Sequence, residues 1–177
     1  MRIALLMDQS GSMCGTKMQE AIQTAYILAA SCQKVNVPVS VWGHDVEHYD
    51  DSIELYKYLD YKERSPKALE KIFNAEAHGC NHDGLAIFQV AYDLAVAKQN
   101  DEELVLIVLS DGSPAGIGDY YGREAEKDIS EIIHTFKKLY QINTIGITIE
   151  TCSEEIDAAR RIYGENTIVV EDSRKLP

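Results

Sequence analysis

The sequence has few cysteines and no long apolar run, and each shortage excludes a class of protein. Its cysteines are Cys14, Cys32, Cys80 and Cys152, and they contain no CxxC pair, which argues against a zinc ribbon and a disulfide framework. No stretch approaches the roughly 18 apolar residues that a membrane-spanning helix needs. The apolar run before Asp8 is too short for the core of a signal peptide. We therefore expect a cytoplasmic protein with reduced thiols and no membrane contact.

Basic residues are also scarce. Lysine and arginine number 17 against 29 for aspartate and glutamate, so the formal net charge is −12. Because the phosphates of nucleic acids and anionic lipid surfaces carry the same sign of charge, both would repel this chain. We expect neither nucleic acid nor a membrane as a partner.

The rest of the composition is that of an ordinary globular protein. Hydrophobic residues make up 45% and charged residues 26% of the 177 residues. A domain usually has roughly 100–200 residues, and no linker rich in proline, glycine or serine interrupts the chain. The sequence therefore predicts one domain over residues 1–177.

Short aliphatic and β-branched runs alternate with longer amphipathic segments, as in a mostly parallel sheet with helices on both faces. Polar and apolar side chains alternate over 52–58, which predicts an antiparallel edge strand with one solvated face. The expected fold is therefore a doubly wound α/β sheet of about six strands. The predicted strands are 3–7, 37–42, 52–58, 104–109, 143–149 and 167–170, and the predicted helices are 16–34, 65–73, 83–98, 122–140 and 153–163.

Gly43 is expected to end the second strand. On that interpretation His44, Asp45, Glu47 and His48 form a solvated, charged loop at the edge where the first strand also ends.

Three loops carry the side chains that indicate a function. Parallel sheets bind ligands beyond the carboxyl ends of their strands, which here are the loops after Met7, after Gly79 and after Leu109. These loops supply carboxylates, two hydroxyls and an amide oxygen, which suit Mg²⁺ or Mn²⁺. The expected metal ligands are Asp8, Ser10, Ser12, Asn81, Asp83 and Asp111.

The pattern Asp-x-Ser-x-Ser at 8–12 resembles the metal-ion-dependent adhesion site of von Willebrand factor type A (vWA) domains. In that family a threonine of the middle loop and an aspartate after the fourth strand complete the site, and the matching positions are Asn81 and Asp111. Asn81 departs from the commoner threonine, and Asp83 could substitute for it or reinforce it. The resemblance implies a Rossmann-like vWA fold.

The patterns Asn-x-Asp-Gly at 81–84 and Leu-Ser-Asp-Gly-Ser-Pro at 109–114 are similar to one branch of the family. This branch holds the C-terminal domain of a cobaltochelatase subunit that works beside an AAA+ ATPase, and the nitric-oxide-reductase activation proteins. The resemblance implies a non-catalytic adaptor that binds an AAA+ ATPase or its client. A component of a cobalt or magnesium chelatase is the first alternative.

The neutral hydroxyls of Ser10 and Ser12 would leave charge on a bound ion, which an aspartate or glutamate of a partner protein could then neutralise. Catalysis has less support. The chain has no GxSxG, GxxxxGK[ST] or GxGxxG pattern, and Ser10 stands where a haloacid-dehalogenase phosphatase needs its second acid. A divalent-metal hydrolase stays an alternative, with His82 or Asp83 as the general base.

Two further features admit both a functional and a structural interpretation. His78, Cys80 and His82, together with Cys14, could hold a softer metal such as zinc, although their spacing is unusual for one. Tyrosines are frequent at protein interfaces, and they gather at Tyr49, Tyr56, Tyr58 and Tyr61 and again in the segment Asp119-Tyr120-Tyr121. Core packing explains part of the first group equally well.

Overall fold

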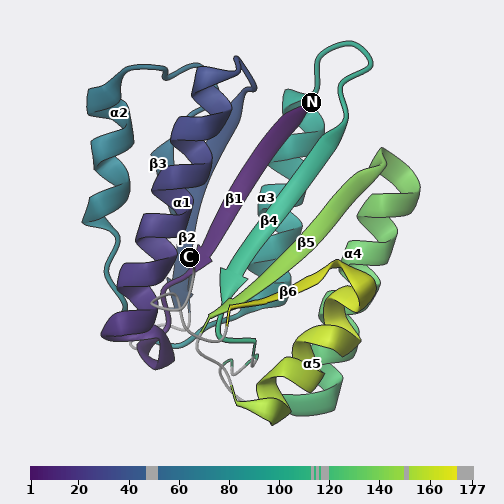
Figure 1. The fold of residues 1–177 in the computed structure, drawn as a ribbon. Coiled ribbons are helices and arrows are strands. Elements are labelled where there is room, and N and C mark those ends of the chain that lie inside the picture. Colours follow the sequence, from purple (N-terminus) through teal and green to yellow (C-terminus); the bar gives the residue numbers. More distant parts are fainter. Residues whose placement is uncertain (47–51, 113, 115, 117–119, 150–151, 171–177) are drawn as a thin grey trace.

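The computed structural model describes residues 1–46, 52–112, 114, 116, 120–149 and 152–170. Six strands form one sheet in the order β3-β2-β1-β4-β5-β6 (Figure 1). Every neighbouring pair is parallel except β2 and β3, which are antiparallel. The predicted mostly parallel sheet with an antiparallel edge is thus confirmed. The strands are β1 (Arg2–Asp8), β2 (Val39–Val46), β3 (Ile53–Leu59), β4 (Leu104–Ser110), β5 (Ile142–Ile149) and β6 (Thr167–Val170).

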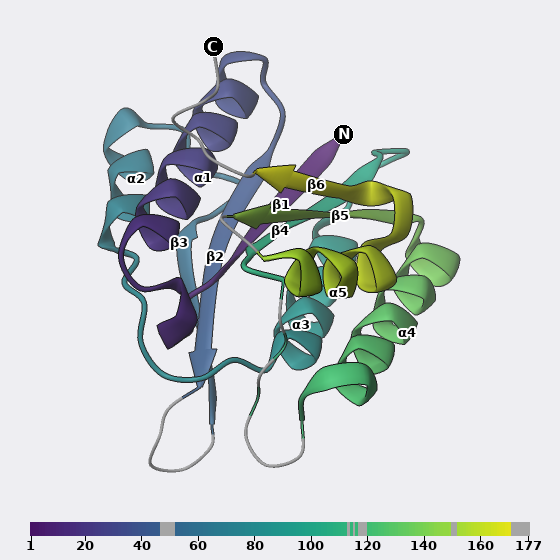
Figure 2. The same cartoon turned by 60° about the horizontal axis from the view of Figure 1, so that its bottom comes forward.

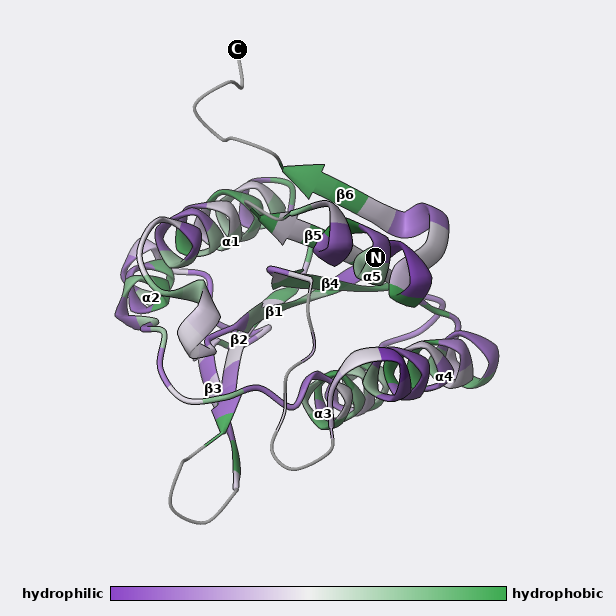
Figure 3. Cartoon of the chain, turned by 90° about the horizontal axis from the view of Figure 1, so that it is seen from below, coloured by the Kyte–Doolittle hydropathy of each residue, from purple (hydrophilic) through white to green (hydrophobic). Residues whose placement is uncertain are grey.

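Helices cover both faces of the sheet. The helix α1 (Thr16–Lys34) and the short α2 (Pro66–Glu70) lie on one face, and α3 (Asp83–Ala97) and α4 (Gly122–Tyr140) lie on the other (Figure 3). The helix α5 (Ser153–Tyr163) packs into the same core as α3 and α4. Three short 3₁₀ turns complete the described elements, at Gly11–Met13, Lys71–Asn74 and Gly164–Asn166. None of the helices in the described part of the chain is long and apolar enough to cross a membrane.

The two faces of the sheet have separate hydrophobic cores because side chains along a strand alternate between faces. In β1, Leu5 and Met7 pack in the core under α1, whereas Ala4 and Leu6 pack in the core under α3. The next side chain of the second set is Asp8. The strand period therefore directs this carboxylate to the α3 face, at the end of the strand.

The prediction that β2 ends at Gly43 is wrong, because the strand continues to Val46. β2 is paired with β3 as far as Val46 and Ile53, so hydrogen bonds within the sheet satisfy the backbone N–H and C=O groups of this part of β2. Gly43 fits because the side chains of Gln9 and Tyr58 occupy the space that a Cβ atom would need.

His44 and Asp45 are consequently buried strand residues, with 0% and 3% of their surface exposed, and not part of a solvated loop. Glu47 and His48 lie outside the described residues.

Candidate metal centre

The residues predicted as metal ligands lie at the carboxyl edge of the sheet, which Figure 2 brings forward. Asp8 ends β1, and Asp111 directly follows β4. These two strands are hydrogen-bonded neighbours. Asp83 is the first residue of α3, where the positive end of the helix dipole favours a carboxylate. Asp8, Asn81, Asp83 and Asp111 are all buried.

Hydrogen bonds shape the loop after β1. The backbone amide of Ser10 donates to Asp8 Oδ1 at 2.8 Å, and the hydroxyl oxygens of Ser10 and Ser12 lie 3.0 Å apart. The amide of Gly11 donates to the carbonyl of Gly79 at 3.0 Å, which ties this loop to the middle loop. Asn81 Nδ2 reaches Asp8 Oδ2 at 3.4 Å. The first and middle loops therefore meet around one carboxylate.

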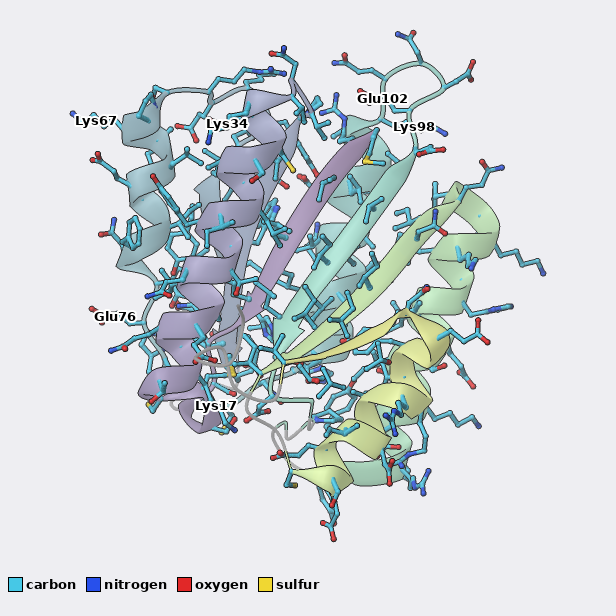
Figure 4. All side chains as sticks on the ribbon, viewed as in Figure 1. Lys17, Lys34, Lys67, Glu76, Lys98 and Glu102 are labelled. Carbon is cyan, nitrogen blue, oxygen red and sulfur yellow. The ribbon has the colours of Figure 1, made fainter. Side chains whose placement is uncertain are left out.

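Asp111 has one oxygen paired and one unpaired. Lys17 Nζ donates to Asp111 Oδ2 at 3.1 Å, while Oδ1 is buried and has no hydrogen-bond partner within the described ranges. Figure 4 shows Lys17 at this end of the molecule, far from Lys98 and Glu102 at the opposite end. The ammonium group of Lys17 is thus a counter-charge already present at the predicted site.

A second arrangement was not expected from the sequence. His44 Nε2 lies 3.4 Å from Asp83 Oδ1, and both side chains are buried. One ligand atom each from Asp8, His44 and Asp83 lies within 4.8 Å of the others, and in the described ranges no other three His, Cys, Asp or Glu side chains meet this condition. The alternation Trp42, His44, Val46 was the signal that could have placed His44 in the strand.

Burial governs the protonation of this group. Burial, with a further contribution from the negative charge of Asp111, raises the pKa of Asp8 to about 6. Burial and the charges of Asp8 and Asp111 raise the pKa of Asp83 well above its usual range. Burial lowers the pKa of His44 to about 4, so its imidazole is neutral at pH 7. Buried carboxyls beside a neutral imidazole need a cation to be ionised together, so these residues fit a divalent metal.

The softer-metal alternative finds no support in the described side chains. Cys14 Sγ donates to the carbonyl of Ala77 at 3.5 Å, and His78 pairs with Asp45. The ring of His82 stacks on Tyr120 with centroids 3.8 Å apart. These side chains therefore have separate contacts and are not gathered around one point.

The tyrosines divide between packing and surface positions. Tyr61 is buried in the core under α3, and Tyr58 donates its hydroxyl to Gln9 Oε1 at 3.0 Å. Tyr121 is 61% exposed directly before α4, so it stays a candidate interface residue. Tyr49 and Asp119 lie outside the described residues.

Comparison with known proteins identifies the architecture. Residues 1–60 match the family model described as the VWA domain of the cobalamin biosynthesis protein CobT. The SpRpn10 VWA domain superposes with a TM-score of 0.63 at 17% identity, over 96% of this chain and 87% of that one. The chain is a von Willebrand factor type A (vWA) domain in its fold.

Other solved structures have a similar fold. The vWF domain of the type V pilus tip protein Mfa5 from Porphyromonas gingivalis has a TM-score of 0.70 at 9% identity, over 96% of this chain and 88% of that one. The pilus adhesin SpaC from Lactobacillus rhamnosus GG has a TM-score of 0.75 at 12% identity. The superposition covers 98% of this chain but only 28% of the adhesin. A comparison with curated protein sequences gives no match. The CobT match runs from β1 through β3 and so includes Asp8, Ser10, Ser12 and His44.

Proposed function

We propose that this vWA domain is a non-catalytic adaptor that binds a partner protein through Mg²⁺ or Mn²⁺. The ion would be held by Asp8, Ser10, Ser12, Asn81, Asp83 and Asp111. The observation that most supports the proposal is the unpaired, buried Oδ1 of Asp111 at the edge where Ser10 and Ser12 place two hydroxyls 3.0 Å apart. A buried carboxylate oxygen without a partner is costly unless a cation or donor meets it.

Each group has a distinct role in this proposal. Ser10 and Ser12 offer neutral oxygens, so they bind a cation without cancelling its charge. Asp8 is oriented by the amide of Ser10, and Asn81 donates to its second oxygen. A bound divalent ion would supply a positive point for a carboxylate from outside. An aspartate or glutamate of the partner would then complete the set of ligands.

The match to the CobT family model supports a partner of the kind that such domains work beside, an AAA+ ATPase or the client that it remodels. The same match supports the second candidate, a non-catalytic component of a cobalt or magnesium chelatase. The two candidate functions differ in the molecules that the domain must work with, since a chelatase component needs partner subunits and a tetrapyrrole.

Thermal unfolding in chelator and in millimolar Mg²⁺ tests whether the metal binds. At about 100 times its dissociation constant the ion adds about 2.7 kcal/mol, a rise in Tm of roughly 5–10 °C for a chain of this size. Asp111→Asn should abolish the rise. Asp101→Asn, at an exposed position between α3 and β4, should keep it.

Binding of an acidic peptide tests the adaptor function itself. A short glutamate-containing peptide should bind in Mg²⁺ and not in chelator, and its glutamine counterpart should bind in neither. Equal binding of both peptides, or binding unaffected by chelator, would contradict the proposal. Co-purification with an AAA+ ATPase that is lost in chelator, without binding of a tetrapyrrole by the complex, would then favour the adaptor over the chelatase component.

A further inference from the structure

Two side chains of types that can bind a metal, a carboxylate and an imidazole, lie on the same face of the sheet at the carboxyl ends of β1 and β2. Asp8 and His44 are direct register partners in the parallel ladder. They follow Leu6 and Trp42, which are also register partners and which both pack in the core under α3. The strand period therefore directs the carboxylate of Asp8 and the imidazole of His44 toward the N-terminus of α3, where Asp83 lies.

The imidazole of His44 is fully buried, with an exposed fraction of 0%. Neither of its ring nitrogens has a hydrogen-bond partner among the residues that the structure describes. Asp83 Oδ1, the atom that it faces at 3.4 Å, likewise has no hydrogen bond to any described residue. Buried polar groups in native proteins nearly always have a partner, so two that face each other unpaired indicate a missing ligand.

The spacing suits one shared ion. Two ligands bound to a tetrahedral zinc at about 2.1 Å lie about 3.4 Å from each other. The separation of His44 Nε2 and Asp83 Oδ1 is 3.4 Å, and a ligand atom of Asp8 lies within 4.8 Å of both. If both carboxylates are ionised, their charge balances a divalent cation.

The donor set determines which ions are favoured. Mg²⁺ prefers oxygen ligands and retains its waters, whereas imidazole nitrogen suits zinc, iron and related transition metals. We propose that Asp8, His44 and Asp83 bind a divalent transition-metal ion such as Zn²⁺ on the α3 face, beside the proposed Mg²⁺ site. The two sites share Asp8 and Asp83. The proposal otherwise depends on His44, which the proposed function does not use.

Calorimetric titration of the metal-free protein with Zn²⁺, and separately with Mg²⁺, tests the assignment. The unmodified protein should bind one Zn²⁺ at least about tenfold more tightly than Mg²⁺. His44→Gln should weaken Zn²⁺ binding at least about tenfold and leave Mg²⁺ binding unchanged. His82→Gln is the matched control because it removes the imidazole next to Asp83 in the sequence, and it should keep both affinities.

A spectroscopic measurement covers the case in which His44→Gln does not fold. Pulsed electron paramagnetic resonance of the unmodified protein loaded with one Cu²⁺, a paramagnetic ion that favours imidazole ligands, should show magnetic coupling to an imidazole nitrogen, and His82→Gln should retain it. Absence of this coupling, or equal Zn²⁺ affinity in a folded His44→Gln, would overturn the site. If the unmodified protein binds no Zn²⁺ but keeps its Mg²⁺-dependent peptide binding, this inference alone is overturned. If the unmodified protein shows neither, both proposals are overturned.

Discussion

Asp8 is a fully buried carboxyl group whose negative charge is opposed by that of Asp111. Its hydrogen bonds from Ser10 and Asn81 favour the ionised form, yet burial dominates and its pKa is raised to about 6. The folded protein therefore keeps a proton on Asp8 at pH values where the unfolded chain has lost it. Asp8 then contributes most to stability below its ordinary pKa of 3.8, and this contribution is lost as the pH rises through 6.

Asp8→Asn should consequently stabilise the metal-free protein. At about 1.4 kcal/mol for each pKa unit, the ionised Asp8 costs the folded state about 3 kcal/mol at pH 7. In chelator we expect Asp8→Asn to unfold with a larger free energy than the unmodified protein by up to that amount. The difference should close as the pH falls from 7 to 4. Denaturant unfolding across this range measures it, with Asp101→Asn as the control that should show no comparable difference.

Added Mg²⁺ should offset that difference. The ion stabilises only a protein that binds it, so it raises the stability of the unmodified chain and leaves Asp8→Asn unchanged. An Asp8→Asn protein that is less stable than the unmodified one in chelator at pH 7 would contradict the assignment of Asp8 as a destabilising, functional charge.

Lys17 occupies Asp111 with an ammonium group where the proposed function requires a metal. Lys17→Met should therefore lower the free energy of unfolding in chelator by about 1–3 kcal/mol, because a buried carboxylate loses its charged donor. The same variant should bind Mg²⁺ more tightly, since the positive charge of Lys17 on the other carboxylate oxygen no longer repels the ion. Lys34→Met, on the exposed last turn of the same helix, is the control and should change neither quantity. Weaker Mg²⁺ binding in Lys17→Met would instead make Lys17 a supporting residue.

At the scale of the element, the second half of β2 depends on Gly43. A Cβ atom there would lie 1.7 Å from Gln9 Oε1 and 2.9 Å from a ring carbon of Tyr58. Gln9 cannot move freely, because its Nε2 donates to the carbonyl of Glu76 at 2.6 Å. The glycine thus lets β2 pass close to the loop after β1, which brings His44 level with Asp8.

Gly43→Ala should destabilise the protein by about 1–3 kcal/mol through this overlap. The cost should be smaller in a Gln9→Ala background, where the shortest contact is gone. A double-mutant cycle measured by denaturant unfolding should give a coupling of at least about 0.5 kcal/mol. Additive effects of the two substitutions would show that Gln9 does not limit the approach of β2.

The same element shows where sequence reasoning succeeds and where it stops. The sheet could be predicted because runs such as Leu104–Leu109 are buried on both faces and need no partner to be recognised. The candidate metal ligands of the loop after β1 could be predicted because the carboxylate of Asp8 and the hydroxyls of Ser10 and Ser12 follow one another in the chain. His44 was missed because a glycine before a polar pair is typical of a strand end, and the short alternation of Trp42, His44 and Val46 is too weak a signal to outweigh it. What continues β2 is its pairing with Ile53–Leu59, a long-range contact that local pattern does not encode.

At the scale of the whole molecule, the proposed site is a local positive point on a chain of net charge −12. The surrounding field repels an acidic partner over distances of about 10 Å at 0.1 M salt, whereas the metal attracts its carboxylate only at contact. Salt screens the long-range repulsion more than the buried, short-range attraction.

The association rate of an acidic peptide should therefore increase with salt. Between about 20 and 150 mM NaCl at constant Mg²⁺ we expect a rise of at least about twofold, the reverse of the usual behaviour of oppositely charged partners. Stopped-flow measurement with a fluorescent glutamate-containing peptide gives this rate, and a peptide with the same glutamate flanked by lysines is the control that should associate more slowly as salt is added. A rate for the acidic peptide that falls with salt would mean that it meets a basic surface, and the metal would then not be the positive group that attracts it.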